Sequence, residues 1–147
     1  VGDLPMPVQV KLLRVIQERE VVRLGESKPR KIDARLVAAT NKDLPAAVKA
    51  KQFREDLLYR LNVITLHLPP LRERGDDVLL LARHFLEQEG KRQRTPRALA
   101  LSDDAAARLR AHRWPGNVRE LQHVCQSLSV MAPEDTITGD DVASALA

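Results

Sequence analysis

Two consecutive prolines, Pro69 and Pro70, divide the chain into two portions with different hydrophobic patterns. A proline cannot donate a strand hydrogen bond, so the β-branched run that precedes Pro69 has to end there. Helical and strand-like patterns alternate before this point, whereas only helical spacing follows it. Such an alternation is typical of a parallel α/β sheet. The sequence therefore predicts an α/β portion over residues 1–70 and an all-helical portion over residues 71–147.

The α/β portion is expected to hold an incomplete sheet. Apolar residues at helical spacing predict a helix from Pro7 to Glu18, and residues 21–32 have the pattern of a hairpin. Residues 32–41 (IDARLVAATN) and 62–68 (NVITLHL) are expected to be buried strands, and Asp43 can cap the helix that follows the first of them. Two central strands are too few for a complete parallel sheet, whose faces are both covered by helices.

Four helices are expected in the second portion. Three of them have a recognisable start, because Ser102, Asn117 and Thr138 are good capping residues. Asp141, three residues after Thr138, completes a capping-box pattern. The basic run over residues 90–100 (GKRQRTPRALA) is expected to be a surface connection between the first two of these helices.

The composition excludes several classes of protein. With 44% apolar residues the chain can bury a core, but 3% aromatic residues are too few for the stacking platform of a single-strand nucleic-acid binder. The net charge of +4 permits a phosphate-bearing partner without requiring one. Cys125, the single cysteine, falls on an apolar helix face and is expected to be a buried small hydrophobe. No apolar run approaches the roughly 20 residues of a membrane span, so we expect a cytoplasmic protein with no membrane partner.

Arg54 is an unusual residue, because helical spacing places it on the apolar arc of the run FREDLLYRL, residues 53–61. Its neighbours Glu55 and Asp56 project to other sides of such a helix, so no local acid is expected to pair with Arg54. Arg60 lies four residues after Asp56, the favourable order for a helical ion pair worth about 0.2–0.5 kcal/mol. We therefore expect the partner of Arg54 to lie outside this chain, and the partner of Arg60 to be local.

Polar side chains also occur at two positions of a type that often binds anions: the end of a strand and the start of a helix. Thr40 and Asn41 stand at the end of an expected strand, beyond which ligands of open α/β sheets bind. Alternatively, Asn41 only forms a turn before the capped helix. Arg119 occupies the first turn of a helix, where the macrodipole disfavours a cation by about 0.3–1 kcal/mol. It is expected to reach for an anion, unless a neighbouring acid pairs with it at the surface.

Other kinds of site are not indicated by the sequence. The four histidines show no metal-ligand spacing with Cys125 or with one another, so no metal site is expected. There is no nucleophile elbow, no spacing of a catalytic carboxylate pair and no G-x-x-x-x-G-K-[ST] phosphate loop.

The motifs occur in an order that resembles one family. GDLPMPVQVKLLRVIQE, VAATNKDL, FREDLLYRLNV, LPPLRERGDDV and WPGNVRELQH follow one another as in the sigma-54-dependent transcription activators, the bacterial enhancer-binding branch of the AAA+ ATPases. The resemblance covers nearly the whole chain, and the combination of motifs is highly specific. It implies the carboxyl-terminal half of an AAA+ domain, with part of a parallel-sheet core over residues 1–70 and a helical lid over residues 71–147.

The resemblance also implies roles for the polar residues described above. Thr40 and Asn41 match sensor I, which reads the γ-phosphate of ATP, and Arg119 matches sensor II in the lid. Arg54 and Arg60 match the arginines proposed to act on the nucleotide of a neighbouring subunit. The parent protein would bind ATP and Mg, and would hydrolyse ATP in a homo-oligomeric ring, a hexamer or heptamer, to remodel sigma-54 RNA polymerase for open-complex formation.

Several parts that the family uses are expected to lie outside this chain. Residues 1–3 resemble those that follow the Walker B acidic pair. That pair, the phosphate loop, the loop that engages sigma-54 and the DNA-binding domain are therefore expected elsewhere in the parent. We expect this chain alone to bind no nucleotide tightly and to hydrolyse no ATP, because the groups that hold the phosphates and magnesium are missing.

A non-enzymatic helical DNA-binding module is the alternative function. It would use four basic residues, Arg108, Arg110, Arg113 and Arg119. A recognition helix presents several base-reading side chains on one face. The last expected helix instead begins with Asp140 and Asp141 and continues with small residues, so the sequence favours the ATPase-derived interpretation.

Overall fold

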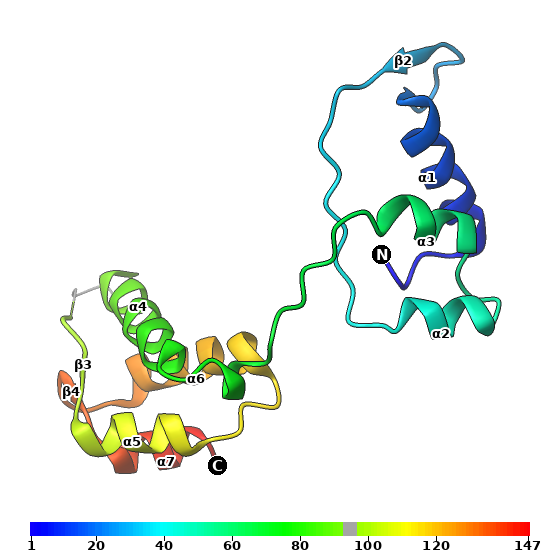
Figure 1. Ribbon diagram of the computed structural model, residues 1–147. Coiled ribbons are helices and arrows are strands. Elements are labelled where there is room, and N and C mark those ends of the chain that lie inside the picture. The colour runs from blue at the N-terminus through cyan, green and yellow to red at the C-terminus, as the bar shows by residue number, and fades with distance from the viewer. Residues whose placement is uncertain (93–96) are drawn as a thin grey trace. The chain divides into compact units, whose positions relative to one another are not determined.

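The structure is a computed structural model that describes residues 1–92 and 97–147. Its contacts divide the chain into two compact units, Val1–Leu66 and His67–Ala147, which can be followed by colour in Figure 1. Each unit has its own hydrophobic core. Residues 93–96, which belong to the basic run predicted as a surface connection, lie outside the described residues.

The first unit combines helices with one short hairpin (Figure 1). Its elements are α1 (Met6–Glu18), β1 (Glu20–Val22), β2 (Pro29–Lys31), α2 (Leu44–Lys49) and α3 (Glu55–Leu61). The two strands are antiparallel, with Val21 opposite Arg30. A small core forms where Leu13 of α1 meets Phe53 and Leu57. The predicted first helix and the predicted hairpin are both confirmed.

The two segments predicted as central strands do not form strands. Residues 32–41 and 62–68 have no strand assignment, and Val37, Ile64 and Leu66 are 82%, 80% and 82% exposed. A strand requires a partner whose N–H and C=O groups bond to its own. Within residues 1–66, all of which are described, the β1–β2 hairpin is the only sheet. The mixed α/β class of the chain is nevertheless confirmed.

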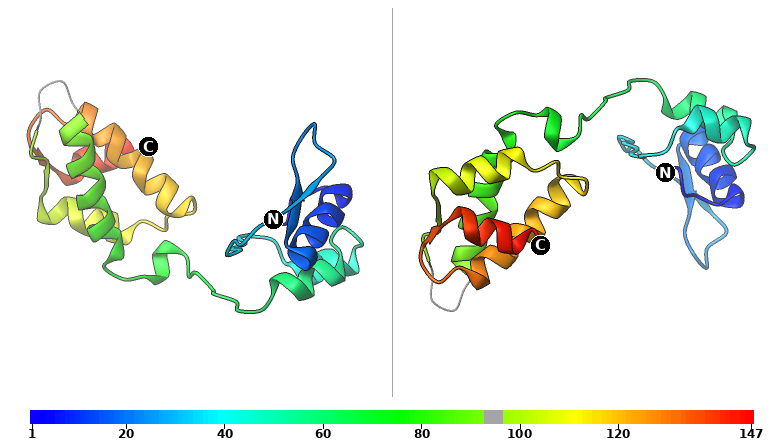
Figure 2. Two further views of the ribbon diagram at one scale, coloured as in Figure 1. Left: turned by 90° about the horizontal axis from the view of Figure 1, so that it is seen from above. Right: turned by 90° about the horizontal axis from the view of Figure 1, so that it is seen from below.

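The second unit is mostly helical. Its elements are the 3₁₀ turn η1 (Leu71–Glu73), α4 (Asp77–Arg92), β3 (Ala100–Leu101), α5 (Asp103–Ala111), α6 (Asn117–Met131), β4 (Thr136–Ile137) and α7 (Gly139–Ala145). Figure 2 shows these helices gathered into one bundle. β3 and β4 form a short parallel pair with Leu101 beside Ile137, so a two-stranded sheet accompanies the helices of the portion predicted as all-helical.

The core of the second unit includes side chains from the facing helices α4 and α6. Leu86 of α4 and both Leu121 and Cys125 of α6 are completely buried. Trp114, just before α6, is 1% exposed, and its Nε1 donates to the carbonyl of Leu109 at 2.8 Å. Full burial of a leucine contributes about 1.5–3 kcal/mol. The apolar contacts therefore hold this unit together, and the predicted burial of Cys125 is confirmed.

Three predicted helix caps are confirmed. The side chains of Asp43, Ser102 and Thr138 each accept a hydrogen bond from the backbone N–H three residues later. The carboxylate of Asp141 also accepts from the N–H of Thr138 at 2.8 Å, which completes the predicted capping box of α7. These starts depend on neighbouring residues alone, which is why the sequence predicts them.

The cap predicted at Asn117 is wrong. Asn117 is the first residue of α6 and has a left-handed backbone with φ 52°, a conformation that asparagine tolerates. Its Oδ1 accepts a hydrogen bond from the N–H of Leu71, 2.8 Å away, and so joins η1 to α6. The carboxylate of Glu120 serves the helix start instead, because it accepts from the N–H of Gly116 at 2.7 Å.

Asn117→Ala is expected to lower the free energy of unfolding by about 1–3 kcal/mol, because the N–H of Leu71 loses its acceptor. Asn117→Gly loses the same bond, but glycine suits the left-handed backbone. Its free energy of unfolding should therefore be about 1 kcal/mol higher than that of Asn117→Ala. Asn117→Asp keeps an acceptor and is the control. Chemical unfolding followed by the fluorescence of Trp114, the single tryptophan, measures all three. An unchanged Asn117→Ala protein would contradict the role of this bond.

Cys125 is expected to be unreactive towards a thiol reagent while the second unit stays folded. Burial, aided by the nearby Glu89, raises the pKa of its thiol to about 12, and the side chain is completely buried. Labelling at pH 8 should therefore be slow in buffer and become fast only in denaturant. Since Cys125 is the single cysteine, the label reports on this position alone. Rapid labelling of the native chain would mean that α6 separates readily from its neighbours.

Candidate functional site

An exposed loop of the first unit carries Thr40 and lies against the first residues of the chain. The backbone nitrogen of Val1 donates to the carbonyl of Ala39 at 2.8 Å. Gly2 approaches the loop so closely that a Cβ there would lie 2.6 Å from the hydroxyl oxygen of Thr40. A side chain at Gly2 would displace Thr40, so the glycine permits the close approach of the two segments.

The loop turns through Thr40 and leaves the side chain of Asn41 exposed. Thr40 Oγ1 accepts a hydrogen bond from the N–H of Lys42 at 3.1 Å. Lys42 Nζ also reaches an oxygen of the Asp3 carboxylate at 2.6 Å, and this hydrogen-bonded pair holds the pKa of Asp3 below its usual value. Asn41 is exposed and has no hydrogen bond to other described residues, so its amide can meet a ligand.

Arg54 does not lie on the apolar face of α3. The helix begins at Glu55, and Arg54 is the preceding residue, with an extended backbone of φ −78° and ψ 132°. Its guanidinium forms a bidentate pair with Asp56, 2.9 Å from Nε to Oδ1 and 2.7 Å from Nη2 to Oδ2. These hydrogen bonds raise the pKa of Arg54 and lower the pKa of Asp56. The prediction that Arg54 lacks a local acid is therefore wrong.

Arg60 is an exposed cation in the last turn of α3. The predicted ion pair between Asp56 and Arg60 is not formed, because Asp56 is engaged by Arg54. No acid among the described residues pairs with Arg60. A cation is favoured at this end of a helix by the macrodipole, so the position is stable without a partner.

Gln9 of α1 contacts Arg54 and is absent from the residues that sequence reasoning selected. Its side chain is completely buried, and its Oε1 accepts a hydrogen bond from the backbone N–H of Arg54 at 2.9 Å. The spacing of Gln9 from the apolar residues of the first helix could have identified it. Gln9 precedes Leu13 by four residues and Ile16 by seven, so it falls on the apolar face of the first helix. A polar side chain at such a position needs partners inside the fold.

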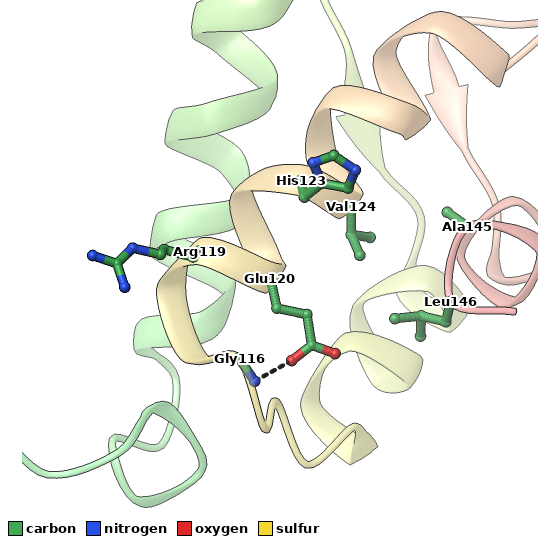
Figure 3. Close-up of a pocket in the computed structure, with 7 residues that line it drawn as sticks. All are labelled: Gly116, Arg119, Glu120, His123, Val124, Ala145 and Leu146. Carbon is green, nitrogen blue, oxygen red and sulfur yellow. Dashed lines mark hydrogen bonds between the residues drawn. The ribbon is translucent and has the colours of Figure 1, made fainter. Parts of the chain in front are cut away.

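Arg119 lies in the first turn of α6, as predicted, beside a hollow of about 610 Å³. The other residues around this hollow are Gly116, Glu120, His123, Val124, Ala145 and Leu146. In Figure 3 the guanidinium of Arg119 points away from Glu120, whose carboxylate accepts a hydrogen bond from the N–H of Gly116. No acid among the described residues pairs with Arg119, so the surface ion pair considered as the alternative is not formed. An anion would stabilise this unpaired cation and the helix start together.

Two of the arginines of the DNA-binding alternative are paired with acids. Arg108 Nη2 lies 3.6 Å from an oxygen of Asp140, and Arg110 Nε lies 2.9 Å from an oxygen of Asp76. Carboxylates this close repel the phosphates that the module would have to bind. The described residues give this alternative no support.

The described part of the chain contains no group of three or more histidine, cysteine or acidic side chains arranged to hold a metal ion. Among the described residues, no helix combines the length and apolar character that crossing a membrane requires.

Two family models match the chain in succession. The sigma-54 interaction domain matches residues 1–67, and the AAA+ ATPase lid domain matches residues 72–147. The alginate biosynthesis transcriptional regulatory protein AlgB of Pseudomonas putida is 50% identical over 137 residues, which are 93% of this chain and 30% of AlgB. The sigma54-dependent transcriptional regulator SfnR of Pseudomonas fluorescens is 51% identical over 142 residues, which are 97% of this chain and 38% of SfnR.

Solved structures of a related regulator have a similar fold. The crystal structure of NtrX from Brucella abortus in complex with ATP matches with a TM-score of 0.79 and 34% identity, covering 96% of this chain and 34% of NtrX. The chain thus spans about a third of the length of the relatives it matches. It belongs to the sigma-54-dependent transcriptional regulators and carries sequence of both their sigma-54 interaction domain and their AAA+ lid domain.

Proposed function

We propose that this chain is the carboxyl-terminal half of an AAA+ ATPase module that hydrolyses ATP in a homo-oligomeric ring and remodels sigma-54 RNA polymerase for open-complex formation. The match to the sigma-54 interaction domain supports the polymerase partner. The NtrX crystal structures in complex with ATP and ADP support the nucleotide. In this proposal residues 1–70 complete the α/β core, and residues 71–147 form the lid.

The close approach of Gly2 to Thr40 is the observation that carries this proposal. In the family, the acidic pair that holds magnesium directly precedes the residues that Val1–Asp3 resemble. A sensor of the γ-phosphate would have to lie near that pair, because the magnesium ion that the pair would hold neutralises charge on the phosphates of ATP. Thr40 lies beside these first residues although it is distant from them in sequence, Asn41 directly follows it, and both residues are exposed. We therefore assign sensor I to them.

The magnesium ion is not assigned to residues of this chain. Mg²⁺ prefers carboxylate and water oxygens. Asp3, the acid nearest to Thr40 in the loop contacts described above, is already paired with Lys42. No group of metal ligands occurs among the described residues. The ligands of the ion would therefore belong to a longer protein, and none of the roles proposed for this chain passes through the metal.

Arg54 is our first candidate for action on the nucleotide of a neighbouring subunit. The pair with Asp56 uses the Nε–H group and one N–H of Nη2, which leaves three of the five guanidinium N–H groups for a phosphate. The side chain is 35% exposed, so these donors are accessible. Such a guanidinium stabilises charge on the γ-phosphate, an effect worth roughly 10³–10⁵ in rate for arginine fingers. Arg60, exposed in the last turn of α3, is the second candidate.

Arg119 is our candidate for sensor II. Its guanidinium has no acidic partner among the described residues, and it projects from the start of α6 (Figure 3). A phosphate that bound it would gain from the helix macrodipole as well as from the guanidinium. We infer that Arg119 couples the state of the nucleotide to the position of the lid.

Arg54→Ala is expected to abolish ATP hydrolysis in a longer protein that carries this chain together with a phosphate loop. Nucleotide binding and folding should be kept, because the backbone hydrogen bond to Gln9 does not need the arginine side chain. Asp56→Asn removes the charge of the pair but not the arginine, so the rate should fall less. Steady-state hydrolysis and binding of a fluorescent ATP analogue measure both variants.

The action between subunits is tested by mixing. Arg54→Ala subunits are combined with subunits defective only in their phosphate loop, each of which should be inactive alone. An interface between an intact pocket and an intact Arg54 should then recover hydrolysis. Assembled rings that stay inactive at every ratio, or an Arg54→Ala protein that unfolds, would show that the arginine is structural.

A further inference from the structure

The buried amide of Gln9 connects three backbone segments. Its Nε2 donates to the carbonyl of Leu4 at 2.8 Å and to the carbonyl of Gln52 at 3.0 Å. Its Oε1 accepts from the N–H of Arg54 at 2.9 Å. One side chain of α1 therefore holds the segment before α1 and both ends of the short stretch that leads into α3.

These bonds require a primary amide of this length. Two carbonyl oxygens need donors and one N–H needs an acceptor, which also determines the orientation of the amide. A methionine has almost the same shape but offers none of these bonds. A glutamate offers the acceptor but, when ionised, no donor. Because the side chain is completely buried, water cannot replace what is lost.

The partner that matters for function is Arg54, which is held at both its ends. Gln9 fixes the backbone N–H, and Asp56 fixes the guanidinium through two hydrogen bonds. Arg54 precedes the first turn of α3, so no i−4 helical bond restrains its N–H. Without Gln9, the backbone from which the arginine projects would be free to rotate. A shift of about 1 Å in a catalytic group can lower a rate about 10²-fold.

We infer that Gln9 is a positioning residue for Arg54: it fixes the backbone from which this arginine reaches the nucleotide of the neighbouring subunit. The inference rests on the proposed function of Arg54. Gln9 itself touches no nucleotide in this scheme. Its effect should therefore appear at the pocket of the neighbouring subunit and not at the pocket of its own.

Gln9→Met in the longer protein is the first test. The turnover number should fall about 10²-fold, while the KM for ATP and ring assembly stay within about twofold of their original values. Gln9→Glu keeps the acceptor for the N–H of Arg54 but, when ionised, turns a carboxylate towards two carbonyl oxygens, so it should exceed the rate of Gln9→Met only at a pH low enough to protonate it. Leu13→Ala is the matched control. It weakens the same helix, one turn further on, without touching the bond to Arg54.

Mixed rings distinguish a positioning role from a general defect. Gln9→Met subunits with an intact pocket are mixed with phosphate-loop variants that have an intact Arg54, and hydrolysis should recover. Gln9→Met subunits mixed with Arg54→Ala subunits should stay inactive, because no subunit then offers a well-placed arginine. If Gln9 instead serves its own pocket, the two results are reversed.

The outcomes distinguish the role of Gln9 from the proposed action of Arg54 between subunits. If Arg54→Ala rings are not rescued by phosphate-loop variants, the proposed function itself fails. If they are rescued but the Gln9→Met results are reversed, only the role of Gln9 is wrong. Equal losses of turnover in Gln9→Met and Leu13→Ala, or loss of fold in both Gln9 variants, would also overturn the inference, because Gln9 would then maintain the fold as a whole.

Discussion

In the first unit, the hydrogen bonds of one buried amide fix the backbone that leads into α3. Its apolar core is small, with Leu13, Phe53 and Leu57 as the buried members. The Gln9 amide adds three bonds to backbone groups that the local elements leave unpaired. A buried polar group that is fully paired specifies one arrangement more strictly than apolar contact does, because each bond has a direction. The geometry around Arg54 is thus set by polar contacts.

The second unit is organised differently. A larger apolar core surrounds Trp114, and polar side chains act mainly where elements begin or meet. Asn117 joins η1 to α6, while Glu120 completes the start of the same helix. Arg119 lies between these two residues in sequence, but its side chain makes no hydrogen bond of this kind to the described residues. Its neighbours complete the helix start, and its guanidinium has no acidic partner among the described residues.

Sequence predictions are correct where a feature depends on residues nearby in the sequence, and fail where it depends on residues far along the chain. The caps at Asp43, Ser102 and Thr138 depend on residues three positions away, and all three form. Strands depend on partners elsewhere, so the apolar run at residues 62–68 is ambiguous by itself. The periodicity of its apolar neighbours predicts that Arg54 lies inside a helix, whereas α3 begins one residue later. The N–H of Arg54 bonds instead to a residue 45 positions away, which no local pattern contains.

The unpaired segments of the first unit also affect how this chain behaves in solution. Neither residues 32–41 nor residues 62–68 pair with a strand within residues 1–66, and both expose large apolar side chains. Unpaired backbone groups beside exposed apolar side chains can pair with a strand of another molecule. We therefore expect copies of this chain to associate through these segments. The net charge of +4 opposes this only weakly at physiological salt, so self-association should grow with protein concentration.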